Sequence, residues 1–201
     1  AYSRGGNWLH LALGVVLVII ASVMISTFVK LNLAIKDIAQ TKRYKEYALT
    51  DIMTGLKSRY AYTIFEAQQK TGSPSNALHL IFLDIDMLKK ANDTLGHVAG
   101  DEMIIAVSKC IKDSFGDVAE CFRMGGDEFL VAMTAETEVV HERVVLFNRL
   151  VSQWSGRYVD RLTVSYGVAS ANEYPGLNFE ELLKTADNMM YDSKKQQTGC
   201  R

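Results

Sequence analysis

Two adjacent carboxylates, Asp127 and Glu128, follow the glycine pair Gly125 and Gly126. Alternating apolar residues on both sides predict two short strands joined by a tight Gly-Gly turn. Such a turn holds acidic side chains at the edge of a sheet, and glycine lets another backbone or a phosphate approach closely. Carboxylates at a hairpin tip therefore suit metal-dependent phosphoryl transfer. The alternative is an ordinary hairpin turn with solvated acids.

A second acidic pair, Asp84 and Asp86, ends an almost unbroken apolar run that begins at Ala77. The run predicts a strand buried on both faces. Residues two apart on a strand point the same way, so the two carboxylates share a side until the strand ends. Mg²⁺ held by one or two carboxylates and by substrate phosphates fits this chemistry. The alternative is a strand that ends in a solvated Asp turn.

Several motifs, in one order, resemble the GGDEF family of diguanylate cyclases. Residues 51–59 (DIMTGLKSR) are similar to D-x-L-T-G-L-x-N-R, and residues 83–93 (LDIDMLKKAND) to D-I-D-x-F-K-x-x-N-D. Residues 96–102 (GHVAGDE) are similar to G-H-x-x-G-D-E, and the signature at residues 125–129 is intact. The resemblance covers roughly residues 51–195.

The resemblance implies condensation of two GTP molecules into cyclic di-GMP with release of two pyrophosphates. Divalent metal, Mg²⁺ or Mn²⁺, would activate the ribose 3′-hydroxyl and neutralise phosphate charge. Asp84 and Asp127 are the expected metal ligands, with the Ile85 carbonyl as a third. Asp127 and Glu128 are the expected catalytic pair, and the division of roles between them stays open. Each domain supplies half of the reacting geometry, so catalysis is expected to require a homodimer.

Asn92 and Asp101 match the family's guanine-reading positions. A carboxylate accepts hydrogen bonds from guanine N1–H and N2–H, and an amide both donates and accepts. Asp101 therefore favours guanine over adenine. Without the resemblance, Asn92 would be interpreted as a helix C-cap and Asp101 as the N-cap of the following helix.

Phosphate contacts are expected from Lys89, from the backbone around Met87 and Leu88, and from Lys194. Lys194 matches the phosphate-contacting lysine of the family motif A-D-x-A-L-Y-x-A-K. The alternative for Lys194 is a surface lysine that interacts with the dipole near a helix end.

Two departures from the family pattern concern affinity and control. The family usually continues K-x-x-G-R after the phosphate lysine, but Gln197 and Thr198 occupy the glycine and arginine positions. Many members carry an inhibitory R-x-x-D for bound product, and here those two positions are Gly116 and Ala119. We therefore expect no product inhibition at that site.

Composition excludes some classes of protein. Lys and Arg total 22 and Asp and Glu total 23, so the formal net charge is −1 and no nucleic-acid partner is expected. Cys110, Cys121 and Cys200 lack the paired spacing of a zinc site or a disulfide framework. Cys110 and Cys121 lie in apolar patterns and are expected in the core.

The N-terminal part predicts a membrane anchor. After a flank over residues 1–7, residues 8–29 form an apolar segment without Lys, Arg, Asp or Glu. About 20 such residues are needed to cross a bilayer. Basic residues are more frequent after the segment than before it, which places the catalytic domain in the cytoplasm at the cell inner membrane, with one or more spans in the full-length protein. Because the chain begins with Ala, we also expect it to be a fragment of a longer sensor.

Residues 30–50 are charged and favour helix, with Leu31, Ile35 and Ile38 near helical spacing. The segment predicts a helical linker that continues from the membrane. Two interpretations stay open: it pairs with its copy as a coiled coil in a dimer, or it is a lone amphipathic connector.

The remaining segment, residues 51–201, predicts an α+β domain. The order of expected elements is ferredoxin-like, and the resemblance implies a nucleotide-cyclase palm with a central antiparallel sheet. Two alternatives to an active diguanylate cyclase are an inactive GGDEF domain that binds GTP or a protein, and a cyclase for another nucleotide. Helices are expected over residues 59–70, with Ser58 as the N-cap, and over 100–113, 138–154 and 179–195. A buried strand is expected over 77–84, a hairpin over 119–133 and a last strand over 162–169.

Overall fold

The computed structural model describes residues 4–70 and 74–199. The chain divides into two compact units, Ala1–Glu46 and Tyr47–Arg201. Each unit is considered by itself. The expected boundaries of the anchor, the linker and the GGDEF domain stay predictions.

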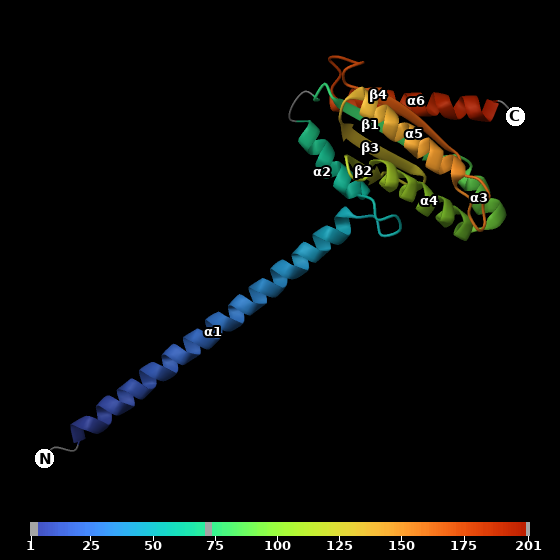
Figure 1. Cartoon of the computed structure of the whole chain (residues 1–201). Coiled ribbons are helices and arrows are strands. Elements are labelled where there is room, and N and C mark those ends of the chain that lie inside the picture. Colours follow the sequence, from blue (N-terminus) through green and yellow to red (C-terminus); the bar gives the residue numbers. More distant parts are fainter. Residues whose placement is uncertain (1–3, 71–73, 200–201) are drawn as a thin grey trace. The chain divides into compact units, whose positions relative to one another are not determined.

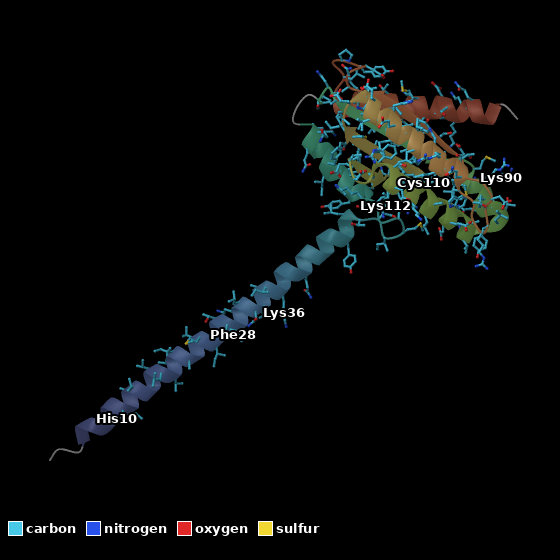
Figure 2. All side chains as sticks on the ribbon, viewed as in Figure 1. His10, Phe28, Lys36, Lys90, Cys110 and Lys112 are labelled. Atoms are coloured by element: carbon cyan, nitrogen blue, oxygen red, sulfur yellow. The ribbon has the colours of Figure 1, made fainter. Side chains whose placement is uncertain are left out.

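Helix α1 (Arg4–Leu49) is a continuous helix of 46 residues, so the apolar segment and the charged segment after it form one element. Its stretch His10–Asp37 spans 28 residues with a mean hydropathy of 2.7 and is long and apolar enough to cross a membrane. The apolar side chains of this stretch are exposed. Figure 2 shows side chains along this helix, with His10, Phe28 and Lys36 labelled.

The second unit is built on a four-stranded sheet with the strand order β2-β3-β1-β4. All three strand pairs are antiparallel, which confirms the expected sheet. Every residue of β1 is buried, as its apolar run predicts. The strands are β1 (Leu78–Ile85), β2 (Ala119–Arg123), β3 (Glu128–Thr134) and β4 (Val164–Ser170).

Helices accompany the sheet in the described part of this unit (Figure 1). They are α2 (Arg59–Gln69), α3 (Leu88–Leu95), α4 (His97–Phe115), α5 (Thr137–Gln153) and α6 (Phe179–Gly199).

Two hydrophobic cores lie on the two faces of the sheet, because alternate residues of a strand point to opposite faces. Ile81, Leu83 and Ile85 of β1 belong to the core that α4 and α5 cover. Leu80 and Phe82 belong to the core that α2 and α6 cover. The fold is thus an α+β palm in which the central strand β1 is covered on both faces.

Local sequence signals explain several boundaries. Ser58 caps α2, since its Oγ accepts a hydrogen bond from the Ala61 amide at 3.2 Å. Cys110 and Cys121 are buried and free, as their apolar surroundings predict. Cys200 lies outside the described residues.

The sequence prediction missed α3 and started α4 too late. α4 begins at His97 rather than at Gly100. Gly96, with φ of 86°, separates α3 from α4, and glycine adopts this backbone conformation without steric cost. Both cap interpretations are therefore wrong: Asn92 lies inside α3, and Asp101 lies inside α4.

Candidate active site

The two acidic clusters meet at one end of the sheet. Asp84, next to last in β1, is the register partner of Glu128, the first residue of β3. The carbonyl of Asp127 accepts a hydrogen bond from the Ile85 amide at 3.1 Å. Backbone pairing therefore fixes three carboxyl-bearing residues in one corner, although 43 positions separate Asp84 from Asp127 in the chain (127 − 84).

This corner disfavours additional negative charge. Burial raises the pKa of Asp84, and the neighbouring charges of Asp127 and Asp86 raise it further. Burial likewise raises the pKa of Glu128, with further contributions from Asp127 and Asp84. A cation or a proton would relieve this repulsion.

Lys194 of α6 supplies one positive charge to the corner. Its Nζ donates a hydrogen bond to Asp84 Oδ1 at 2.5 Å, and its side chain is 37% exposed. Partial burial lowers the pKa of Lys194, but the hydrogen bond and charge of Asp84 outweigh that effect and raise it overall. The lysine is therefore an ion-pair partner of Asp84 at the site, a contact that the alternative of a surface lysine near a helix end does not include.

The donor set fits a divalent metal that completes its coordination with substrate. Carboxylate and carbonyl oxygens are the ligands of Mg²⁺, which usually takes one or two carboxylates plus phosphate oxygens and water. Asp84, Asp127 and the Ile85 carbonyl are of the right kind, and the crowded negative charge favours a cation. Within residues 4–70 and 74–199, no three His, Cys, Asp or Glu side chains form a ready-made metal site. The protein therefore offers only part of a coordination sphere.

The loop between β2 and β3 is longer than the predicted two-glycine turn. Met124, Gly125, Gly126 and Asp127 separate the strands, and the Met124 amide donates to the Glu128 carbonyl at 2.9 Å. Neither glycine adopts a positive φ, and close approach to a neighbouring atom accounts for Gly125 alone. A Cβ at Gly125 would lie 3.3 Å from Glu128 Oε2, whereas a Cβ at Gly126 would meet open space.

Arg123 braces this loop, and the sequence analysis missed it. Its Nε donates to the Gly125 carbonyl at 3.2 Å, and its Nη2 donates to the Gly126 carbonyl at 3.0 Å. Its Nη1 also contacts the Asp51 carboxylate at 3.2 Å. Asp51 in turn accepts hydrogen bonds from the amide and hydroxyl of Thr54. A charged residue ending an apolar strand was the signal available in the sequence.

The two expected guanine-reading residues lie on neighbouring helices. Asn92 of α3 packs against Gly100 of α4, where an added Cβ would come within 2.0 Å of Asn92 Oδ1. Asp101 is the next residue of α4 and is exposed. Gly100 therefore allows the Asn92 amide to lie next to the helix turn that carries Asp101.

The expected phosphate-binding segment joins β1 to α3. Met87 has a positive φ of 61° and precedes the first helical residue, Leu88. Amides in the first turn of a helix lack partners within the helix and attract anions. Lys89 is exposed beside them. The segment is thus suited to phosphate, next to the acidic corner.

The carboxylates of Asp86 and Glu102 accept hydrogen bonds from other parts of the chain. Asp86 Oδ1 accepts from the Ser165 hydroxyl at 2.7 Å, and the Asp86 amide donates to the Thr163 carbonyl at 3.0 Å. The Glu102 carboxylate accepts from the backbone amides of Arg157, Tyr158 and Val159. Sequence analysis assigned no such role to Glu102, because the loop it holds is more than 50 residues away along the chain.

An antiparallel palm with acidic residues on its central strand and on the adjoining hairpin defines a domain of the nucleotide-cyclase type. The sequence pattern of the family described as "Diguanylate cyclase, GGDEF domain" matches residues 48–200. The chain belongs to the GGDEF family.

Two relatives show the same resemblance over most of the chain. Diguanylate cyclase DgcS of Shewanella oneidensis is 31% identical over 180 residues, which are 84% of this chain and 58% of DgcS. Diguanylate cyclase VdcA of Vibrio cholerae is 30% identical over 181 residues, which are 82% of this chain and 51% of VdcA. The chain thus spans between half and three fifths of the length of these relatives.

Solved structures agree with the fold. The GGDEF domain of DgcB from Caulobacter crescentus, in complex with c-di-GMP, is 28% identical with a TM-score of 0.64, covering 74% of this chain and 91% of that one. Diguanylate cyclase SiaD from Pseudomonas aeruginosa, in complex with its activator SiaC, has a TM-score of 0.66 at 21% identity, covering 96% of this chain and 78% of that one. At that identity SiaD supports the fold alone.

Proposed function

We propose that this protein is a diguanylate cyclase that condenses two GTP molecules into cyclic di-GMP and releases two pyrophosphates. The observation that carries the proposal is the pairing of Asp84 with Glu128, beside Asp127, at the end of the central strand. Relatives named diguanylate cyclase support the same activity.

In each half-reaction, a ribose 3′-oxygen forms a bond to an α-phosphorus and the bond to the pyrophosphate oxygen breaks. The Asp127–Glu128 pair accepts the proton of the hydroxyl, and the raised pKa of Glu128 makes its carboxylate a stronger base than an ordinary glutamate. Asp84, Asp127 and the Ile85 carbonyl would hold Mg²⁺ or Mn²⁺. That ion supplies Lewis-acid stabilisation of phosphate charge.

The other site residues bind and orient GTP. Asn92 and Asp101 pair with the guanine edge, and a base that leaves their polar groups unpaired is rejected. Lys194, Lys89 and the amides at the start of α3 bind phosphate oxygens. Lys194 is placed to do so because it already lies at the acidic corner.

A second copy of the chain supplies the other GTP. Neither domain holds both reactants, so turnover requires two loaded domains to face each other. We propose that α1 crosses the cell inner membrane, holds the catalytic domain on the cytoplasmic side and raises its local concentration for pairing. Its apolar stretch of 28 residues supports this proposal.

The direct test is to incubate the purified chain with Mg²⁺ and either GTP or ATP and to identify products by mass. We expect cyclic di-GMP from GTP and no dinucleotide from ATP. Asp127→Asn and Glu128→Gln should each lower turnover on the order of 100-fold or more. The exposed Asp93→Asn on α3 is the matched control and should retain activity. Tight GTP binding without any product would instead favour a silent GTP-binding domain.

The role of α1 is tested by a chain that starts at Tyr47. This start keeps the carbonyls of Ala48 and Leu49, which accept hydrogen bonds from Ser58. We expect the shortened protein to fold, to lose membrane association and to show activity that rises steeply with protein concentration. Unchanged activity and unchanged concentration dependence would refute a role of α1 in pairing.

A further inference from the structure

A cleft of about 440 Å³ lies between α3 and the segment that leads into β4. Its volume falls in the range typical of small-molecule sites. Apolar surface from three parts of the chain meets two basic side chains there. The residues that define it chemically are Met87, Lys90, Leu95, Met103, Val159 and Arg161.

The cleft adjoins the proposed nucleotide site at Met87, which lines the cleft and also belongs to the proposed phosphate-binding segment, but the rest of that site lies elsewhere. Asn92 packs against Gly100 between α3 and α4. By contrast, Lys90 and Leu95 of α3 line the cleft together with Val159. Neither Asn92 nor any of the acidic residues on the β2–β3 hairpin lines it.

The cleft carries positive charge that the fold does not neutralise. Lys90 and Arg161 are exposed, and neither forms a salt bridge within the described part of the chain. Figure 2 shows Lys90 projecting outward beside α3. The acidic residue that lines the cleft, Asp86, is 8% exposed and bonded to Ser165, so its carboxylate presents little surface to a ligand.

The apolar part of the cleft has a wall that is held in place. Glu102 accepts a hydrogen bond from the Val159 amide at 3.2 Å and from two preceding amides. Met103, the next residue of α4, is buried. A wall fixed in this way lowers the ordering cost of binding.

We propose that this cleft binds a small amphipathic anion. Lys90 and Arg161 hold its carboxylate head, and Leu95, Met103 and Val159 pack against its apolar body. Charge complementarity selects the head, and the apolar wall selects a hydrocarbon body over a small inorganic anion.

The probe is 3-phenylpropionate, titrated calorimetrically into the full chain in detergent micelles. We expect saturable binding with a dissociation constant on the order of 0.1–1 mM. Acetate, which has the head without the body, and 3-phenylpropionamide, which has the body without the charge, should each bind about tenfold more weakly. GTP should leave the probe bound, because Asn92, Asp101 and the acidic residues of the β2–β3 hairpin do not line the cleft.

The variant Lys90→Gln/Arg161→Gln should weaken probe binding about tenfold, while Lys109→Gln, an exposed lysine of α4, should not. Leu95→Glu, at an exposed position, places a negative charge beside the apolar body of the probe. This variant should also weaken binding, and it tests the apolar contact independently of the two basic residues. Circular dichroism verifies the fold of each variant. Absence of saturable binding up to about 5 mM, equal binding of the amide, full displacement by GTP, or unchanged binding in the folded variants would overturn the proposal.

Discussion

Lys194 lies 2.5 Å from Asp84, although 110 positions separate the two residues along the chain. The contact joins the last helix to the end of the central strand. It places an ammonium group against a carboxylate that is 9% exposed and has two acidic neighbours. The lysine therefore offsets negative charge at the acidic corner of the folded domain, and its contact with substrate phosphate stays a proposal.

Replacing Lys194 by Met should move the acid limit of activity to higher pH. Asp84 must be ionised to hold a cation, and its pKa already lies above the ordinary 3.8. Lys194 is the group that opposes this rise, so its loss raises the pKa of Asp84 further. We expect an activity loss on the order of 100-fold at neutral pH and an acid limb shifted upward in a pH–rate profile. Lys195→Met, which removes a neighbour stacked on Tyr191, is the control and should leave the limb in place.

The stability of the metal-free protein should respond to pH at both groups. The folded pKa of Asp84 is raised, so folding binds its proton more tightly and stability falls as pH rises through the range just above 3.8. The folded pKa of Lys194 is raised above 10.5, so its contribution is complete below that pH and is lost above it. Thermal unfolding of the wild type and of Lys194→Met should be measured across this pH range. An equal loss of stability at alkaline pH in both proteins would contradict the assignment.

Glu128→Gln should stabilise the metal-free domain while it removes activity. Burial and the charges of Asp127 and Asp84 raise the pKa of Glu128, so folding carries a free-energy cost for its ionised form. A neutral amide avoids this cost, and we expect a rise in Tm of about 2 °C. Added Mg²⁺ should raise the Tm of the wild type more than that of the variant. The exposed Glu142→Gln on α5 should change neither quantity, and a lower Tm for Glu128→Gln would contradict the prediction.

Arg123→Lys should disorder the catalytic loop although it conserves charge. Lysine cannot reproduce the planar fork that contacts Asp51 and both glycine carbonyls. We expect a stability loss of about 1–3 kcal/mol, measured by denaturant unfolding, and a fall in kcat on the order of tenfold. Arg149→Lys at an exposed position of α5 is the matched control. A variant with wild-type kcat would show that the brace is dispensable.

Gly100→Ala should weaken GTP binding through Asn92. The added Cβ would lie 2.0 Å from Asn92 Oδ1, so the amide must move. We expect GTP affinity to fall about tenfold with the fold retained. Asn92→Ala should cause a similar loss, and the double variant should show no additional loss in a double-mutant cycle. Additive losses would place the effect of Gly100 elsewhere.

Product should not inhibit through the region between α4 and β2. Gly116 follows α4 and Ala119 begins β2, so neither position provides a charged side chain. Nearby Asp117 is paired with Arg143 at 2.9 Å. Cyclic di-GMP at about 10 µM should leave the initial rate unchanged and show no binding at this region by calorimetry. Micromolar product that binds there and slows turnover would refute the expectation.

Much of the palm could be predicted because its signals are local. The apolar run before Asp84 predicted a doubly buried strand, and β1 has that burial. Alternation around Gly125 predicted the hairpin. By contrast, α3 has eight largely polar residues and no side-chain cap, so neither periodicity nor a start signal marked it. Its N-terminus depends on the left-handed Met87 and on packing against α4.

The side-chain contacts within the candidate site could not be predicted from the spacing of residues in the sequence. Lys194 with Asp84 and Arg123 with Asp51 are tertiary contacts between residues far apart in the chain. The sequence identified Lys194 only through its resemblance to a family motif, and it gave Arg123 no role. The side chains of Gln197 and Thr198 lie outside what the structure describes, so the effect of that departure stays a prediction.

The central position of β1 affects how slowly the backbone amides next to the candidate site exchange with solvent. Amides of β1 are bonded to β3 on one side and to β4 on the other. Amides in such a strand exchange with solvent only when the whole domain unfolds, whereas loops and edges open locally at much lower cost. We therefore expect the amides of β1, which carries Asp84, to be among the slowest in the domain to exchange with solvent. Local motion is instead expected in the loop over residues 124–127, which precedes Glu128, and in any molecule that binds there.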